Sequence, residues 1–251
     1  MVTARQLYAG QSLMPPCPAS ARRFPRAGIL SAVPPAARSP QSPQLNAELA
    51  RVALEVLDHD ATYAETALEE VELPGQHARG VTFETVSFRS VDLSGSQLEH
   101  LNVADARFSG CNLANVQARA AGITRVSIES SRLTGIALTE ASVHDLTVQG
   151  CRVDLASFGF SRLARVTFED CLLAHTSFLD AQLESVRFHD CDLSGADFRG
   201  AVLRHCEFRR VELSGLEGVQ SLRGAAMEWS DIIGMAGVWA AALGIEVLDA
   251  D

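Results

Sequence analysis

Large hydrophobic residues recur at every fifth position of this sequence, without a slip in register, from Tyr63 to Leu213. The 31 pentad centres comprise 13 Leu, nine Phe, four Val, two Ile and one Tyr, and only Ala78 and Ala118 are small. Two residues before each centre lies a second column, which holds Ala, Cys, Ser, Thr or Val at 27 of 31 positions; the exceptions are Gln76, Leu101, Ile136 and Leu146. Neither a helix of period 3.6 nor a plain strand of period 2 keeps this pattern in phase, so the sequence predicts a solenoid.

Each pentad has to point one large and one small side chain inward and then turn a corner. Four such sides close a square coil of 20 residues, and the 155 residues from 61 to 215 make about 7.75 coils. Successive coils are expected to stack like parallel strands, roughly 4.8 Å apart. Glycine and small polar residues, such as Ser94 and Gly95, suit the corners because the backbone there needs relaxed sterics.

Several pentads resemble the A(D/N)LXX motif of the pentapeptide-repeat family, among them residues 91–95 (VDLSG), 111–115 (CNLAN), 191–195 (CDLSG) and 196–200 (ADFRG). The resemblance covers about 60% of the chain. It implies an all-β fold, a right-handed quadrilateral β-helix, without catalytic residues. The best-studied members of that family bind DNA gyrase and topoisomerase IV, imitate duplex DNA in shape and charge, and confer fluoroquinolone resistance.

The segments that flank the repeats have a different composition. Residues 1–45 hold eight of the nine prolines, five arginines and no acidic residue, a composition that predicts a disordered tail. Residues 46–60 are predicted to form an N-terminal helical cap, because Leu49, Val52, Ala53 and Val56 fall on one helical face. A solenoid needs its open ends covered, and this segment is placed to cover the first coil.

Residues 216–251 are predicted to form a C-terminal capping and dimerisation helix. Ser230 or Asp231 can cap a helix that continues through Leu243, and Gly244 is placed to end it. The helix is apolar on two sides, so one side can cover the last coil and the other can contact a second copy. In gyrase-binding members of the resembled family a C-terminal helical segment forms the dimer interface. The candidate interface residues are Ile232, Met235, Val238 and Trp239.

The sequence contains no motif typical of an enzyme, a cofactor site or a metal site. Cys111, Cys151, Cys171, Cys191 and Cys206 occupy the small inward column and are interpreted as buried hydrophobic residues with inert thiols. His175 and His189 are expected outside the coil and therefore apart from these thiols. No stretch is long enough to span a membrane. The protein is therefore expected to be non-enzymatic, without cofactors, and located in a reducing, cytoplasmic compartment.

Charge gives two hypotheses for function. The chain carries a net charge of −10, but residues 48–72 contribute −7 whereas the longer stretch 73–215 contributes only −3. Asp105, Arg125, Asp145 and Arg165 alternate at one corner and are interpreted as exposed ion pairs of small energetic value. The favoured hypothesis is a protein–protein interaction module with an unknown partner. The alternative is a DNA mimic that binds DNA gyrase or topoisomerase IV and protects against a drug or toxin, without direct binding of nucleic acid. The candidate partner-binding residues are Glu69, Glu70, Glu72, Asp170, Asp180 and Asp190.

Overall fold

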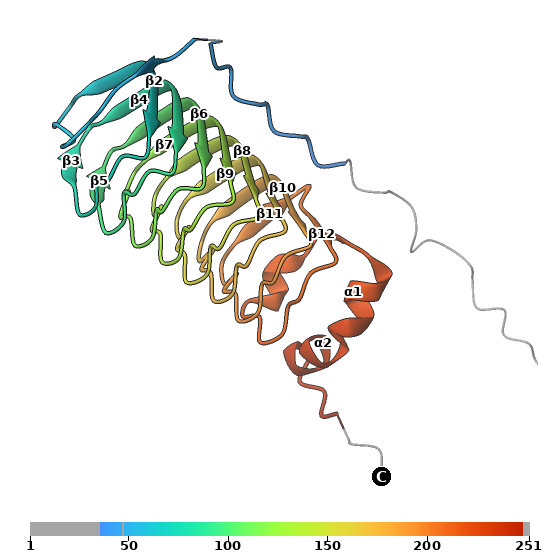
Figure 1. The fold of residues 1–251 in the computed structure, drawn as a ribbon. Coiled ribbons are helices and arrows are strands. Elements are labelled where there is room, and N and C mark those ends of the chain that lie inside the picture. The colour runs from blue at the N-terminus through green and yellow to red at the C-terminus, as the bar shows by residue number, and fades with distance from the viewer. Residues whose placement is uncertain (1–35, 47, 248–251) are drawn as a thin grey trace, which may run out of the picture. The chain divides into compact units, whose positions relative to one another are not determined.

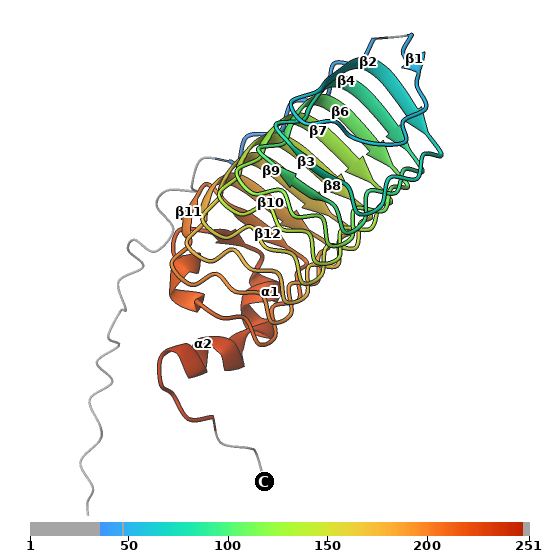
Figure 2. The ribbon, with the colours of Figure 1, turned by 90° about the vertical axis from the view of Figure 1, so that its left-hand side faces the viewer.

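A computed structural model describes residues 36–46 and 48–247, which all lie in the compact unit of residues 34–251. The main parallel sheet follows the order β1-β2-β4-β6-β7-β8-β9-β10-β12-β13, with β11 paired to β10, and β3 pairs with β5 (Figures 1 and 2). The described elements are β1 (Ala50–Arg51), β2 (Thr62–Glu69), β3 (His77–Arg79), β4 (Thr82–Arg89), β5 (Gln97–Glu99), β6 (Asn102–Ser109), β7 (Gly122–Glu129), β8 (Ser142–Gln149), β9 (Arg162–Glu169), β10 (Gln182–His189), β11 (Val202–Arg204), β12 (Glu207–Arg209), the 3-10 helix η1 (Val219–Leu222), β13 (Ala226–Met227), α1 (Trp229–Gly234) and α2 (Ala236–Ala242).

Neighbouring coils of the repeat pair with an offset of 20 residues. Thr62 lies opposite Thr82, Gln182 lies opposite Val202, and the same offset holds in the strand pairs between them. Each eight-residue strand bends at its middle and forms two sides of the square. The other two sides are joined by single bridges such as Asp92–Asn112 and by backbone hydrogen bonds. The fold is therefore the β-solenoid that the five-residue period predicts.

The two inward columns are confirmed along the repeat. Thirty of the 31 pentad centres are buried, and Tyr63, at the first centre, is half-buried. Phenylalanines 20 residues apart stack with nearly parallel rings: the ring centroids of Phe168 and Phe188 are 5.3 Å apart with an interplanar angle of 4°. Rings on adjoining sides meet edge to face, as Phe178 and Phe188 do at 5.6 Å. Offset-stacked and edge-to-face arrangements are the favourable geometries for aromatic pairs, so these columns stabilise the stack beyond their burial.

The prediction of a helix in residues 46–60 is wrong, because the segment is extended. β1 pairs in parallel with β2, with Ala50 opposite Thr66, and the Val52 amide donates to the Ala67 carbonyl. The first coil leaves one edge of its backbone unpaired, and satisfying those donors and acceptors outweighs the helical pattern. Leu57 is buried against the core, whereas Val56, which was assigned to the apolar helical face, is exposed. The segment still covers the first coil. Its pairing, together with that of Glu217 and β13 at the other end, extends the solenoid to about nine turns rather than 7.75.

The C-terminal segment forms two short helices rather than the single predicted helix from 230 to 243. β13 pairs with β12, and then α1 and α2 follow with a break at Met235, where φ is −91° and ψ is 9°. Because of this break, the Met235 side chain points toward the end of the hydrophobic core, and Met235 is only 4% exposed. Val238 and Trp239 pack against the same core and are half-buried. These contacts are consistent with the predicted capping role. Since Met235 is buried within its own chain, it is not available to a second copy as predicted.

Residues 36–45 also differ from the prediction of a disordered tail. They are extended, and the Gln41 and Gln44 amides donate to carboxylates on the coils. The part of that prediction that concerns residues 1–35 lies outside the described residues.

Candidate protein-binding surface

The corners of the coils give the outer surface its regular form. At each of the 32 corners from Asp60 to Gly215, the backbone is left-handed, with φ between 48° and 70°. Nine of these residues are glycine and 23 carry a side chain. A side chain in this region costs conformational energy, least for Asn and Asp. The corner side chain projects from the solenoid, so the residue type at each corner varies without disturbing the core.

The structure brings together the three predicted glutamates near the first coil. Glu69, Glu70 and Glu72 line an open hollow of about 780 Å³ between β2 and the β1 segment. Arg51 lies in the same hollow, and its guanidinium is 3.1 Å from the Glu69 carboxylate. This end of the solenoid therefore carries a local negative charge that Arg51 partly offsets.

The three predicted aspartates do not form one cluster. Asp170 and Asp190 occupy the same corner of adjacent coils, whereas Asp180 is ten residues, or half a coil, away and lies at the opposite corner. Asp190 is also paired: Arg210 donates two hydrogen bonds to its carboxylate, at 2.5 and 2.6 Å. This contact with Arg210 lowers the pKa of Asp190. The later coils therefore do not present a continuous acidic stripe.

The column of Asp105, Arg125, Asp145 and Arg165 is less exposed than its sequence suggested. Arg165 binds Asp145 through two hydrogen bonds, at 2.7 and 2.6 Å, and Arg125 binds Asp105 in the same two-point manner. The Asp145 and Asp105 side chains are only 5% and 12% exposed. The pKa of each carboxyl is lowered, first by its arginine and further by a backbone amide from residues 36–46. These are partly buried, two-point ion pairs, in contrast to the exposed pairs that we predicted.

An apolar patch that we did not predict lies on the middle coils. Leu155 and Phe160 occupy successive corners and are 60% and 59% exposed. The residues between them, 156–159 (ASFG), carry no charge. Leu172, 49% exposed, lies on the adjoining side of the next coil, where its backbone pairs with Arg152. We call Leu155, Phe160 and Leu172 the Leu155 patch. Its signal was in the sequence, because only these two of the 32 corners carry a large hydrophobic residue.

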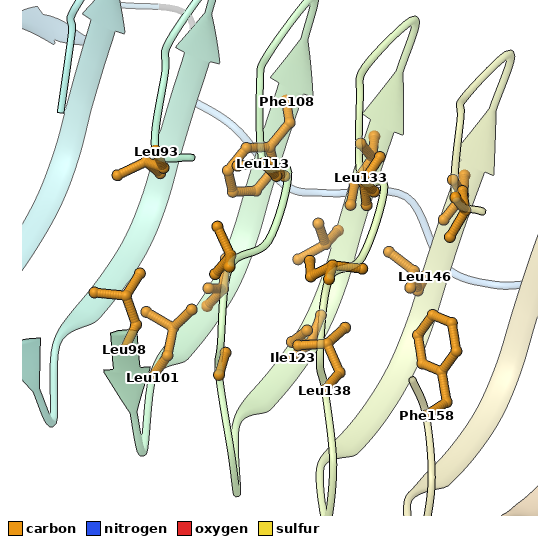
Figure 3. Close-up of a pocket in the computed structure, with 18 of the residues that line it drawn as sticks. Leu93, Leu98, Leu101, Phe108, Leu113, Ile123, Leu133, Leu138, Leu146 and Phe158 are labelled. Atoms are coloured by element: carbon orange, nitrogen blue, oxygen red, sulfur yellow. The ribbon is translucent and has the colours of Figure 1, made fainter. Parts of the chain in front are cut away.

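The interior offers no chemistry to complement this surface. A cavity of about 60 Å³ lies on the axis between Phe108 and Phe158, where the centres are the smaller Leu, Ile, Val and Ala118 (Figure 3). All the residues that line it are hydrophobic. Burial raises the pKa of the Cys151 and Cys206 thiols to about 11, and the Cys151 thiol donates to the Gln149 carbonyl. Neither the cavity nor these thiols provide an acid, a base or a nucleophile at neutral pH.

Metal-ligating side chains are dispersed over the described part of the chain. Within 36–46 and 48–247, no group of three or more His, Cys, Asp or Glu side chains is arranged to hold a metal ion. None of the helices among these residues has the length and hydrophobicity needed to span a lipid bilayer.

Comparisons with known proteins match part of the repeat to a family model. The family model described as pentapeptide repeat region matches residues 102–174 and 150–217. No curated protein matches the sequence. Among solved structures, the chain is similar to HetL, a pentapeptide repeat protein involved in heterocyst differentiation regulation in the cyanobacterium Nostoc. The identity is 20% and the TM-score 0.41, over 67% of this chain and 90% of HetL.

Two other solved structures are similar at the same level. A trypsin-treated form of QnrB1, a plasmid-mediated fluoroquinolone resistance protein, is 17% identical with a TM-score of 0.37, over 73% of this chain and 99% of that one. Rfr23, a pentapeptide repeat protein from the cyanobacterium Cyanothece, is 18% identical with a TM-score of 0.37, over 47% of this chain and 89% of that one.

Proposed function

Because this chain is a pentapeptide-repeat protein, we propose that it is a non-enzymatic interaction module that binds a partner protein through the Leu155 patch. Proteins of this family are generally structural or interaction modules, and the comparisons indicate no catalytic family. The cavity in the described interior is lined by hydrophobic side chains alone, so we assign the binding role to the outer surface of the solenoid.

The observation that carries the proposal is the pair of hydrophobic corners. Leu155 and Phe160 have φ values of 59° and 60°, a conformation that costs a large side chain roughly 1–2 kcal/mol relative to the right-handed region. Both side chains also remain largely exposed to water. Glycine would avoid both costs and asparagine or aspartate would reduce them; these three residue types occupy 16 of the other 30 corners. Exposed apolar residues that lie together on a surface, bordered by polar residues, are typical of a protein-binding surface.

We expect substitution of the patch to abolish partner capture without unfolding the chain. Tagged wild-type protein and the double variant Leu155→Ser/Phe160→Ser are compared as baits in a lysate of the source cells, with captured proteins identified by mass spectrometry. Val202→Ser is the matched control, since Val202 is 50% exposed but lies on a different side of the coil. A partner retained by Val202→Ser and lost by the double variant supports the proposal. A partner that both variants retain excludes the patch as its binding site.

DNA gyrase is the alternative partner, and the net charge of −10 is the observation in its favour. The Arg210–Asp190 pair and the position of Asp180 on another corner count against a continuous acidic flank. Purified gyrase is therefore included as a second arm of the same experiment. Salt-sensitive inhibition of supercoiling by the wild type, lost in Asp170→Arg/Asp180→Arg/Asp190→Arg but kept in Leu155→Ser/Phe160→Ser, would replace our proposal with the DNA-mimic function.

We further propose that the chain forms a homodimer through its C-terminal helices. Large hydrophobic residues are concentrated there on the outer surface, away from the buried Met235: Trp229, Ile233, Leu243, Ile245 and Val247 are all more than half exposed. This set replaces Met235 in the predicted interface. It leaves Ile232, Val238 and Trp239, which are half-buried, at its margin.

Analytical ultracentrifugation at micromolar concentration tests the dimer. The wild type is expected to sediment as a dimer, and Ile233→Glu/Leu243→Glu as a folded monomer, because two charges would be buried without partners in the interface. Val56→Glu, which places a charge on a similarly exposed residue at the other end of the solenoid, should remain dimeric. A monomeric wild type would contradict the proposal.

A further inference from the structure

Residues 36–46 cross the coils instead of following them. Figure 1 shows this segment, in blue, running across the stacked strands toward the C-terminal end of the solenoid. Its contacts begin at the first coil, where the side-chain Nδ2 of Asn46 donates to the Glu65 carboxylate at 3.0 Å. They end at β10, where Arg187 donates to the Ser39 hydroxyl at 3.0 Å and to the Ala37 carbonyl. A segment of 11 residues therefore touches coils that are 122 residues apart in the sequence.

The central contacts of this segment repeat every three residues. The Gln44 amide donates to the Asp105 carboxylate at 3.0 Å, and the Gln41 amide donates to the Asp145 carboxylate at the same distance. The sequence repeats with the same period, since residues 39–44 read Ser-Pro-Gln-Ser-Pro-Gln. The burial of residues 37–44 has the same period of three. Ala37 is buried, and Pro40 and Pro43 are half-buried, whereas residues 38, 39, 41, 42 and 44 are exposed. One residue in three faces the coils, as in a polyproline II helix.

The pitch of such a helix matches the spacing of the coils. A polyproline II helix advances about 3.1 Å per residue, or about 9.3 Å for each Ser-Pro-Gln triplet. Asp105 and Asp145 are 40 residues apart, which is two coils, and coils about 4.8 Å apart place them about 9.6 Å from each other. Each triplet therefore brings its Gln amide to the next aspartate without strain.

The alternation of charge in the column produces this two-coil spacing. Arg125 and Arg165 each hold their aspartate from the neighbouring coil by two hydrogen bonds, which fixes the carboxylates. An aspartate on every coil would add acceptors midway between these two, about 4.8 Å from each. No backbone amide one whole triplet further along the helix would reach such an acceptor. Outward-facing Ser127 and Ser185, on the same flank, are only 7% and 4% exposed, so the flank is covered along its length.

We propose that this flank is a binding site for polyproline II segments that repeat proline every three residues, and that residues 37–44 of the chain fill it in cis. The aspartates accept hydrogen bonds from the backbone amides that follow each proline, the prolines hold the helix and pack on the flank, and Arg187 binds the end of the ligand. The site is separate from the Leu155 patch and does not depend on the function proposed for it.

A pair of full-length variants isolates the amide contacts. Gln41→Pro/Gln44→Pro removes the two donated N–H groups while it preserves the polyproline II conformation. Gln41→Ala/Gln44→Ala is the matched control, because it keeps both amides and changes the same two exposed side chains. Amide hydrogen exchange on the wild type tests the same contacts without any substitution. The Gln41 and Gln44 amides should be protected from exchange, and the Ser39 and Ser42 amides should exchange freely.

The binding test uses a fluorescent peptide of residues 36–46 and measures its anisotropy. The proline variant, whose own segment is weakened, should bind the peptide at least about tenfold more tightly than the wild type or the alanine control, in which the tethered segment competes. A peptide with one extra Ser between the triplets should bind the proline variant at least about tenfold more weakly, because its pitch no longer matches the coils. The proposal is overturned if the proline variant binds neither peptide, binds both equally, or if all four amides exchange alike.

Discussion

Replacement of Phe168 by Asp is expected to abolish folding. The Phe168 side chain is fully buried, stacks on Phe188 and meets Phe158 edge to face at 6.0 Å. A carboxylate at this position would have no partner, and burying a polar or charged group without one costs several kcal/mol. That cost is comparable with the whole stability of a typical domain, about 5–15 kcal/mol. Circular dichroism and thermal unfolding measure the outcome, which should be a chain without a cooperative transition.

Two milder substitutions separate charge from packing in this test. Phe168→Leu, which keeps the site apolar, should retain the fold at a cost of about 1–2 kcal/mol. Arg119→Ala, which removes an exposed pair with Glu140, should cost under about 1 kcal/mol. A Phe168→Asp protein that melts at the wild-type temperature would contradict the inward assignment of the pentad centres.

Substitution of Gly218 by Ala is expected to detach the C-terminal cap. Gly218 precedes η1 with a φ of 76°, and a Cβ there would lie 2.4 Å from the Arg199 nitrogen and 2.6 Å from the Phe198 carbonyl carbon. These are backbone atoms of the preceding coil and cannot move aside as a side chain can. We expect a loss of at least about 3 kcal/mol in the free energy of unfolding, measured by chemical denaturation. The fluorescence of Trp239, which packs on the core through the cap, should report the detachment.

Gly95→Ala is the matched control for this substitution. Gly95 has a similar φ of 68°, but a Cβ added there would have no atom within 4 Å outside its own chain neighbours. The control therefore pays only the conformational cost of a left-handed alanine, roughly 1–2 kcal/mol. Equal losses for the two variants would show that the close approach of Gly218 to the preceding coil is unimportant.

The sequence predicts the solenoid well because each pentad meets the same requirement. A large residue such as Phe168 and a small one such as Cys171 are fixed by their distance from the axis, which repeats on every coil. The ends of the solenoid lack this repetition. Residues 46–60 have a helical pattern of hydrophobic residues, but they pair instead with the open edge of β2. That edge exists only in the folded solenoid, so the local sequence could not reveal it. The break at Met235 has a similar origin, since the burial of the Met235 side chain against the end of the core depends on the folded solenoid.

The candidate surfaces were less predictable than the fold. The acidic residues were chosen by charge, and charge alone did not reveal that Asp190 is paired or that Asp180 lies at another corner. The segment of residues 36–46 has the composition of a disordered tail, and only the two-coil spacing of Asp105 and Asp145 identifies its place. Leu155 and Phe160 could have been identified from the sequence, because large hydrophobic residues at corners depart from the pattern of the other 30.

The crossing segment also changes how the stack resists unfolding. In a repeat protein each unit contacts only its neighbours, so the end units fray first and unfolding spreads inward by small steps. Here one strip of chain joins the first coil to β10 through contacts with Glu65, Asp105, Asp145 and Arg187. A terminal coil cannot leave without loosening a connection that the central coils share. The segment therefore acts as a longitudinal brace, which makes a one-dimensional array of coils behave more like a single cooperative domain.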